Sequence, residues 1–212
     1  MSNNNNNNDD DDDKEGGVSL QTIGDFIKAL AAKQPTPGGG ASAAIGAALG
    51  GAAASMAAAY TQRPKDETTG AAEQARQLIT IMEWNELVQA ADEDAKAYGA
   101  LQTTWKKDHG LTEEQVTAIK ETALQVPTHL VQTCHRYILA IQEFLPNCNP
   151  NIKSDAKVGI HLLAGAARAA YQTVLVNAPT PEQIGHLKKL LTEIQQIEVD
   201  LLQLDHEETT PS

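Results

Sequence analysis

One aspartate of this protein lies at a position where burying an ionised side chain is energetically unfavourable. Between residues 71 and 107, apolar side chains recur at alternating steps of four and three, which predicts a long helix with an apolar seam. Asp94 lies on that seam, where an unpaired carboxylate is strongly unfavourable. It therefore indicates either a buried ion pair or hydrogen bond to a neighbouring helix, or a carboxylate with a functional role. The seam residues are Leu87, Ala91, Asp94, Tyr98, Leu101 and Trp105.

A turn of proline and glycine is the second chemical feature. Residues 35–40 read Pro-Thr-Pro-Gly-Gly-Gly and lead directly into an apolar segment. Proline fixes φ near −65° and glycine adopts conformations closed to other residues, so this backbone can come close to a ligand. A glycine run alone is a weak anion-binding signal, and a sharp entry into a helix is the structural alternative.

The third feature is a loop of turn-forming residues between 146 and 155. Ser154 is placed to cap a helix, and Asp155 is predicted to be the first residue of that helix. On this stretch alone, a favourable interaction with the helix dipole is the preferred explanation of Asp155.

The remaining polar residues favour structural roles. Asp92 can pair with Lys96 one turn on, so it is interpreted as solvated surface. His129 and His135 are six residues apart and cannot share a metal on one helix face, and no Glu-x-x-His pair of the di-iron bundles occurs. No metal site is predicted. Cys134 and Cys148 lie in no metal or redox spacing, which favours a reducing cytosol.

Periodicity, capping boxes and prolines predict the elements that position these residues. No stretch combines β-branched residues with strict alternation, so the predicted fold is all-α, a bundle of six helices. Residues 63–70 are predicted to form a loop, and Pro127 is expected to kink the fourth helix. The six predicted helices cover residues 19–33, 41–61, 71–107, 112–144, 155–177 and 181–204.

The second of these helices is expected to occupy the centre of the bundle. It carries no charge and consists mostly of alanine and glycine, and small residues recur every fourth position. Such a ridge lets a second backbone come very near, and the small residues at 164–170 predict that this partner is the fifth helix. A membrane span fits the length, but alanine and glycine supply little insertion free energy. The ridge consists of Ser42, Gly46, Gly50, Ala54 and Ala58.

Length and charge limit the class of protein. The 212 residues are divided into a disordered low-complexity tail or expression linker at 1–17, one helical domain at 18–204 and a polar tail at 205–212. The net charge is −12, of which residues 9–15 contribute −5. The remaining charge of about −7 excludes a general nucleic-acid binder, which needs a basic surface. No secretory or mitochondrial signal is present, so a cytoplasmic protein without membrane contact is expected.

Three segments together resemble the cyclodeaminase/cyclohydrolase family: 35–42, Asp94 to Tyr98, and 149–156. The likeness extends from Leu20 to Leu204, and the Pro-Thr-Pro-Gly-Gly-Gly stretch is its most specific mark. It implies an all-helical homodimer, with no tightly bound cofactor, that takes a tetrahydrofolate derivative as substrate. The enzyme would either expel ammonia from a formimino group or hydrolyse a methenyl bridge, and the sequence does not choose between them.

The resemblance also implies roles for individual residues. Asp94 and Asp155 are the candidate catalytic residues, because both reactions pass through a cationic carbon and need a proton moved. The glycines would bring backbone amides against the substrate, Lys153 would meet a carboxylate of the folate, and Tyr98 would position the ring or the acid. The candidate substrate-binding residues are Thr36, Pro37, Gly38, Gly39, Gly40, Ser42, Tyr98, Asn151 and Lys153.

One departure from the family pattern leaves a second function open. Residues 61–65 read Thr-Gln-Arg-Pro-Lys, where the family often has Thr-x-Gly-Lys-Lys, so a folate-binding or dimerisation module without turnover is the alternative. A purely structural bundle explains neither the glycine run nor an aspartate on a buried seam. A homodimer is also predicted because the small-residue ridges expose more close-packing surface than six helices cover.

Overall fold

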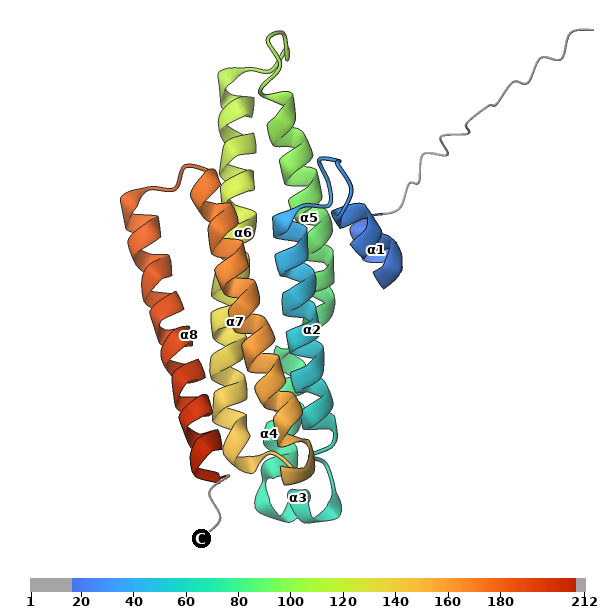
Figure 1. Cartoon of the computed structure of the whole chain (residues 1–212), viewed down its shortest axis with the longest axis vertical. Coiled ribbons are helices and arrows are strands. Elements are labelled where there is room, and N and C mark those ends of the chain that lie inside the picture. Colours follow the sequence, from blue (N-terminus) through green and yellow to red (C-terminus); the bar gives the residue numbers. More distant parts are fainter. Residues whose placement is uncertain (1–16, 209–212) are drawn as a thin grey trace, which may run out of the picture.

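The computed structural model describes residues 17–208, and within them every regular element is a helix, with no strand. The long helices lie alongside one another in an elongated bundle (Figure 1). The predicted all-α fold is thus confirmed, while the predicted tails lie largely outside the described residues. The helices are α1 (Ile23–Leu30), α2 (Gly39–Ala59), α3 (Pro64–Thr69), α4 (Ala71–Ile81), α5 (Trp84–Thr103), α6 (Glu113–Phe144), α7 (Lys153–Val176) and α8 (Pro181–Glu208).

The described chain has more helices than the predicted six. Residues 63–70, predicted to be a loop, contain α3, which Pro64 opens at its first turn. The backbone and the guanidinium of Arg63 both donate to the Asp66 carboxylate, at 2.9 and 2.6 Å. These bonds hold the pKa of Asp66 at about 2 and fix the start of the helix. The polar composition suggested a loop because this local ion pair was not foreseen.

The predicted helix at 71–107 is two helices, α4 and α5. The backbone leaves helical geometry at Met82, and the N–H of Glu83 donates to the Tyr137 hydroxyl at 3.0 Å. That hydroxyl lies on α6, 54 residues away in sequence. Local periodicity therefore carries no sign of the break.

Two predicted local contacts are not formed. Asp92 does not pair with Lys96, because its carboxylate accepts hydrogen bonds from the backbone N–H and the hydroxyl of Ser19. It thereby ties α5 to the segment before α1. Ser154 does not cap the helix that follows it, since α7 already begins at Lys153.

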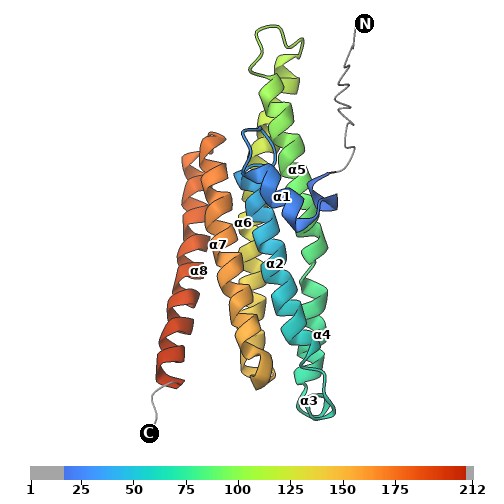
Figure 2. The same ribbon diagram turned by 45° about the vertical axis from the view of Figure 1, so that its right-hand side comes forward.

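α2 lies at the centre of the bundle, between α5 and α7 (Figures 1 and 2). It is long and apolar enough to cross a membrane by length and composition, with a mean hydropathy of 1.4. Other helices nevertheless bury 56% of that stretch. Burial within the protein therefore explains the absence of charge on just over half of this stretch, whereas Leu49 and Met56 lie on a face of α2 that is exposed in the single chain.

A close contact between helix backbones joins α2 to α7 through two glycines. A Cβ on Gly159 would lie 2.8 Å from the carbonyl oxygen of Gly50, and a Cβ on Gly50 would lie 2.9 Å from that of Gly159. The added Cβ of Gly159 would also meet Ala54 at 3.2 Å. The predicted ridge of small residues thus does bring two helix backbones together.

α6 continues as one helix through Pro127. Proline has no N–H, so the Ala123 carbonyl four residues earlier loses its helical partner. The Nδ2 of Asn177, at the end of α7, donates to this carbonyl at 3.0 Å. The same nitrogen donates to the carbonyl of Thr173 at 3.0 Å, so one side chain joins the two helices.

The Gly50 and Gly159 contact predicts that Gly159→Ala destabilises the protein. The new methyl group meets backbone atoms that cannot rotate away, so α2 and α7 must separate, and such overpacking costs about 1–3 kcal/mol. In a chain of this size that lowers the melting temperature by roughly 2–4 °C per kcal/mol. Gly185→Ala in α8 is the control: its Cβ meets nothing within 4 Å, and helix propensity then stabilises by up to about 1 kcal/mol. Equal melting temperatures would contradict the prediction.

Candidate functional site

A cavity of about 740 Å³ opens where the proline and glycine turn meets α5 and the end of α7. Its walls are mostly apolar, with a few polar groups directed into it, as is typical of sites for small molecules. Six of the predicted site residues line it: Thr36, Gly38, Gly39, Gly40, Asp94 and Tyr98.

Asp94 lies directly against the turn. A Cβ on Gly40 would be 1.9 Å from the Asp94 Oδ1 atom, so the missing side chain of Gly40 makes room for the carboxylate. Burial raises the pKa of Asp94, and a hydrogen bond from the Ala41 backbone N–H partly offsets that rise. Within the part of the chain that the structure describes, no basic side chain pairs with Asp94. Of the two structural alternatives considered above, the buried ion pair is therefore not formed among the described residues, whereas the hydrogen bond to a neighbouring helix is present through Ala41 of α2.

The glycines of the turn have ordinary backbone angles, so any need for glycine there comes from the missing side chain. Gly38 is extended, with φ of −122°, and the described glycines with positive φ are Gly70 and Gly110. A Cβ on Gly39 would meet nothing within 4 Å. The unusual backbone conformations expected of Gly38, Gly39 and Gly40 are thus not adopted. Among the three, Gly40 alone must lack a Cβ because of contacts within the described chain, and the close approach of the turn to a substrate stays a prediction.

Three other predicted residues, Asn151, Lys153 and Asp155, belong to the opposite end of α2. The N–H of Asn149 donates to the Thr61 hydroxyl, and its side chain donates to the Tyr60 carbonyl, each at 3.0 Å. This fixes the loop that carries Asn151, Lys153 and Asp155 beside the end of α2, whereas the glycine turn stands at its start. The 21 residues of α2 span roughly 30 Å. A single chain therefore does not bring Asp94 and Asp155 together.

Pro37 and Ser42 also fall outside the cavity wall, although both adjoin it in sequence. The wall includes residues that were not predicted. Leu101 and Trp105 belong to the same seam as Asp94, so periodicity could have identified them. The wall residues that α7 supplies belong to no sequence motif, so no feature of the sequence predicted them. The unpredicted residues are Pro35, Leu101, Trp105, Ala169, Gln172, Thr173, Val176 and Asn177.

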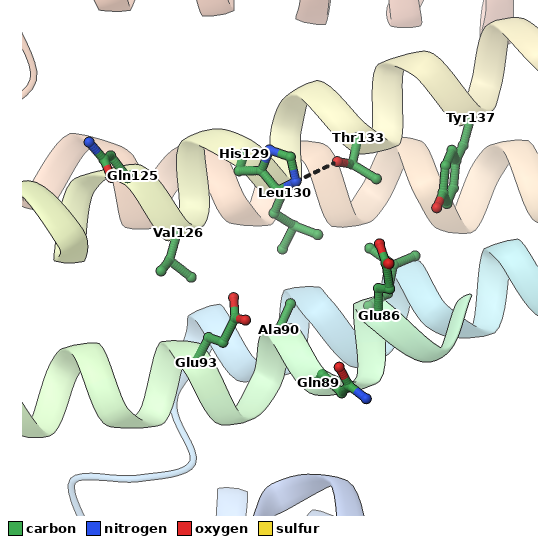
Figure 3. A pocket seen from close by; sticks show the side chains of 11 residues that line it. Glu86, Gln89, Ala90, Glu93, Gln125, Val126, His129, Leu130, Thr133 and Tyr137 are labelled. Carbon is green, nitrogen blue, oxygen red and sulfur yellow. Dashed lines mark hydrogen bonds between the residues drawn. The ribbon is translucent and has the colours of Figure 1, made fainter. Parts of the chain in front are cut away.

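A second cavity, of about 390 Å³, lies between α5 and α6 (Figure 3). Glu86 and Glu93 line it from α5, facing His129 on α6 (Figure 3). His129 is exposed, and its Nε2 lies 3.4 Å from the Thr133 hydroxyl. None of the predicted site residues lines this cavity. Among residues 17–208, no group of three or more His, Cys, Asp or Glu side chains is arranged to hold a metal ion.

Comparison with known proteins supports one family. The family model described as Formiminotransferase-cyclodeaminase matches residues 22–196. Methenyltetrahydrofolate cyclohydrolase of Methylorubrum extorquens is 29% identical over 184 residues, 82% of this chain and 88% of that protein. Formimidoyltransferase-cyclodeaminase of Gallus gallus is 26% identical over 174 residues, 77% of this chain. The match spans only 32% of the chicken protein's length.

Among solved structures, formiminotetrahydrofolate cyclodeaminase from Thermotoga maritima has a similar fold. The TM-score is 0.73 at 21% sequence identity, and the match covers 88% of this chain and 94% of that chain. The shared architecture agrees with the all-helical bundle described above.

The raised pKa of Asp94 predicts how Asp94→Asn affects stability. Because the folded protein binds this proton more tightly than the unfolded chain, stability falls as pH rises from the ordinary value of 3.8 through the raised pKa. The ionised form therefore costs stability at neutral pH, and the amide removes that cost. The melting temperature of Asp94→Asn at pH 7 should equal or exceed that of the wild type, with the difference shrinking in acid. A loss of about 3 kcal/mol or more would instead reveal a buried cationic partner.

Proposed function

The chain belongs to the formiminotransferase-cyclodeaminase family, and we propose that it is a folate-dependent one-carbon enzyme acting on formimino- or methenyl-tetrahydrofolate. In the first reaction, N10 attacks the formimino carbon, one proton is taken up, and ammonia leaves as the methenyl bridge closes. In the second, water adds to the methenyl carbon, the bond to N5 breaks, and one proton is released. The folate is the substrate, and no tightly bound cofactor is proposed.

The observation that carries this proposal is the unpaired Asp94 carboxylate at the cavity wall. Both reactions involve a cationic carbon between N5 and N10, which forms in the first reaction and is attacked by water in the second. A fixed carboxylate can stabilise the forming cation in the first reaction and accept the proton of the attacking water in the second. Because burial raises the pKa of Asp94, the group also exchanges a proton closer to neutral pH than a free aspartate does. The Ala41 N–H keeps the carboxylate oriented along the turn.

We propose further that the enzyme works as a homodimer whose sites combine residues of both subunits. α2 and α7 run antiparallel and carry an unpartnered apolar face. A twofold axis beside Leu49, midway along α2, would place the end of one α2 helix beside the start of the other. Asp155 and Lys153 of the partner subunit would then approach the cavity that holds Asp94. The exposed apolar residues of the face are Leu49, Met56, Tyr60, Val158 and Leu162.

The proposed compartment is the cytoplasm. Cys134 and Cys148 are both free thiols and both buried. Burial raises the pKa of the Cys134 thiol to about 12, so it carries no reactive thiolate near neutral pH. Free, unreactive thiols suit a reducing environment.

Turnover of the two folates tests the proposed activity. Purified protein is mixed with formimino- or methenyl-tetrahydrofolate, and the near-UV band of the methenyl form is followed: it rises in the first reaction and falls in the second. Asp94→Asn should lower the rate roughly 100-fold or more, because a preorganised charge is lost. Gly40→Ala should also lower it, since its Cβ displaces the Asp94 carboxylate.

Gly99→Ala is the matched control for Gly40→Ala, because its Cβ meets nothing within 4 Å and Gly99 does not line the cavity. It should keep the wild-type rate. Binding of folate by calorimetry without any change in the methenyl band would favour the non-catalytic module, and absence of both would refute a folate site.

Mixing two inactive variants tests whether the site is shared. Asp94→Asn and Asp155→Asn homodimers should each be nearly inactive. In a mixed dimer, one of the two sites would receive an intact Asp94 from one subunit and an intact Asp155 from the other. Unfolding and refolding the variants together at equal amounts should restore about a quarter of the wild-type rate, since about half of the dimers are mixed. No recovery despite mixed dimers, or a monomer mass by light scattering, would contradict the shared site.

A further inference from the structure

An aromatic pair lies at the mouth of the cavity. Tyr98 and Trp105 both line the cavity, and their side chains remain 38% and 62% exposed. Their rings meet edge to face, with centroids 6.0 Å apart and planes at 81°. This contact fixes the indole beside the opening while leaving much of its surface free. Aromatic side chains held this way present a flat apolar face to a ligand ring.

The cavity becomes more exposed along α5, away from the turn. Gly40 is buried and Asp94 is half-buried, whereas Tyr98, one helical turn further, is exposed, and Trp105 beyond the end of α5 is more exposed still. At about 1.5 Å per residue, Tyr98 lies roughly 6 Å along the helix from Asp94. The proposed reacting carbon therefore sits at the deeper end, and the aromatic pair stands where the ligand leaves the protein.

The parts of tetrahydrofolate follow one another in an order that suits this change from buried to exposed. The carbon between N5 and N10 joins the pteridine to an aminobenzoyl ring, which ends in a charged glutamate. The glutamate keeps its hydration only at the open end, because burying an unpaired carboxylate is costly. Hence the aminobenzoyl ring must cross the mouth, and the pteridine must occupy the deeper end beside residues 35–40.

We propose that the indole of Trp105, held edge-on by Tyr98, packs against the aminobenzoyl ring of the folate and so sets the direction in which the substrate enters. This inference rests on the proposed function, because it names the part of the folate that this wall binds. An aromatic contact of this kind contributes a factor of roughly ten to affinity.

Fluorescence of a single tryptophan tests the contact directly. The chain has two tryptophans, so Trp84→Phe leaves Trp105 as the one reporter, and Trp84 does not line the cavity. Titration with p-aminobenzoylglutamate, which lacks the pteridine, should change the Trp105 emission and saturate. Titration with a tetrahydropterin, which lacks the aminobenzoyl ring, should leave it unchanged. The reverse pattern would overturn the proposed direction.

Kinetics with the methenyl substrate provide the second test. Trp105→Ala should raise KM about tenfold and change kcat by less than about twofold. Trp105→Phe, which keeps an aromatic ring, should raise KM much less. Trp84→Phe should have the KM and kcat of the wild type. Melting temperatures should stay unchanged in all three, because both indoles are partly exposed.

The two proposals fail in different ways. Wild-type turnover with an unchanged KM in Trp105→Ala would overturn the aromatic contact and leave the enzymatic function standing. A wild type that neither binds the folate by calorimetry nor turns it over would overturn both.

Discussion

The rest of the structure depends on the close approach of α2 and α7 at Gly50 and Gly159. Each glycine occupies space next to the carbonyl oxygen of the other, at a separation that excludes any Cβ. Because the two helices run antiparallel, this contact also determines what meets at their ends. The turn before α2 faces the last residues of α7 and encloses the cavity, while the loop before α7 is bonded to Tyr60 and Thr61 at the end of α2.

The same packing explains why a costly carboxylate is tolerated. The mostly alanine and glycine surface of α2 leaves α5 close enough for Asp94 to touch the backbone at Gly40. There the carboxylate loses part of its hydration, yet it receives no cationic partner from the described chain. A fold selected for stability alone would place an apolar or uncharged side chain at this position. The unpaired charge is the kind of local conflict that functional sites show.

Much of the fold could be predicted because its signals are local. Helical periodicity identified the seam of Asp94, Tyr98 and Trp105, and small residues identified the contact of α2 with α7. The break before α5 could not be predicted, since the hydroxyl of Tyr137 that bonds Glu83 lies on another helix. The site was only partly predictable: the turn and Asp94 do meet, but the link to Asp155 came from a family resemblance, and one chain holds the two aspartates at opposite ends of α2.

The wall that α7 contributes to the cavity shows why some residues were missed. Nothing around Asn177 resembles a binding motif, and the reason for its position lies on α6. Pro127 frees the Ala123 carbonyl, and the Nδ2 of Asn177 donates to it and to the Thr173 carbonyl, each at 3.0 Å. Both hydrogens of the amide are then used, so its Oδ1 is the atom left to accept a hydrogen bond. A proline on one helix thus determines that Asn177, which lines the cavity, offers a ligand an acceptor rather than a donor.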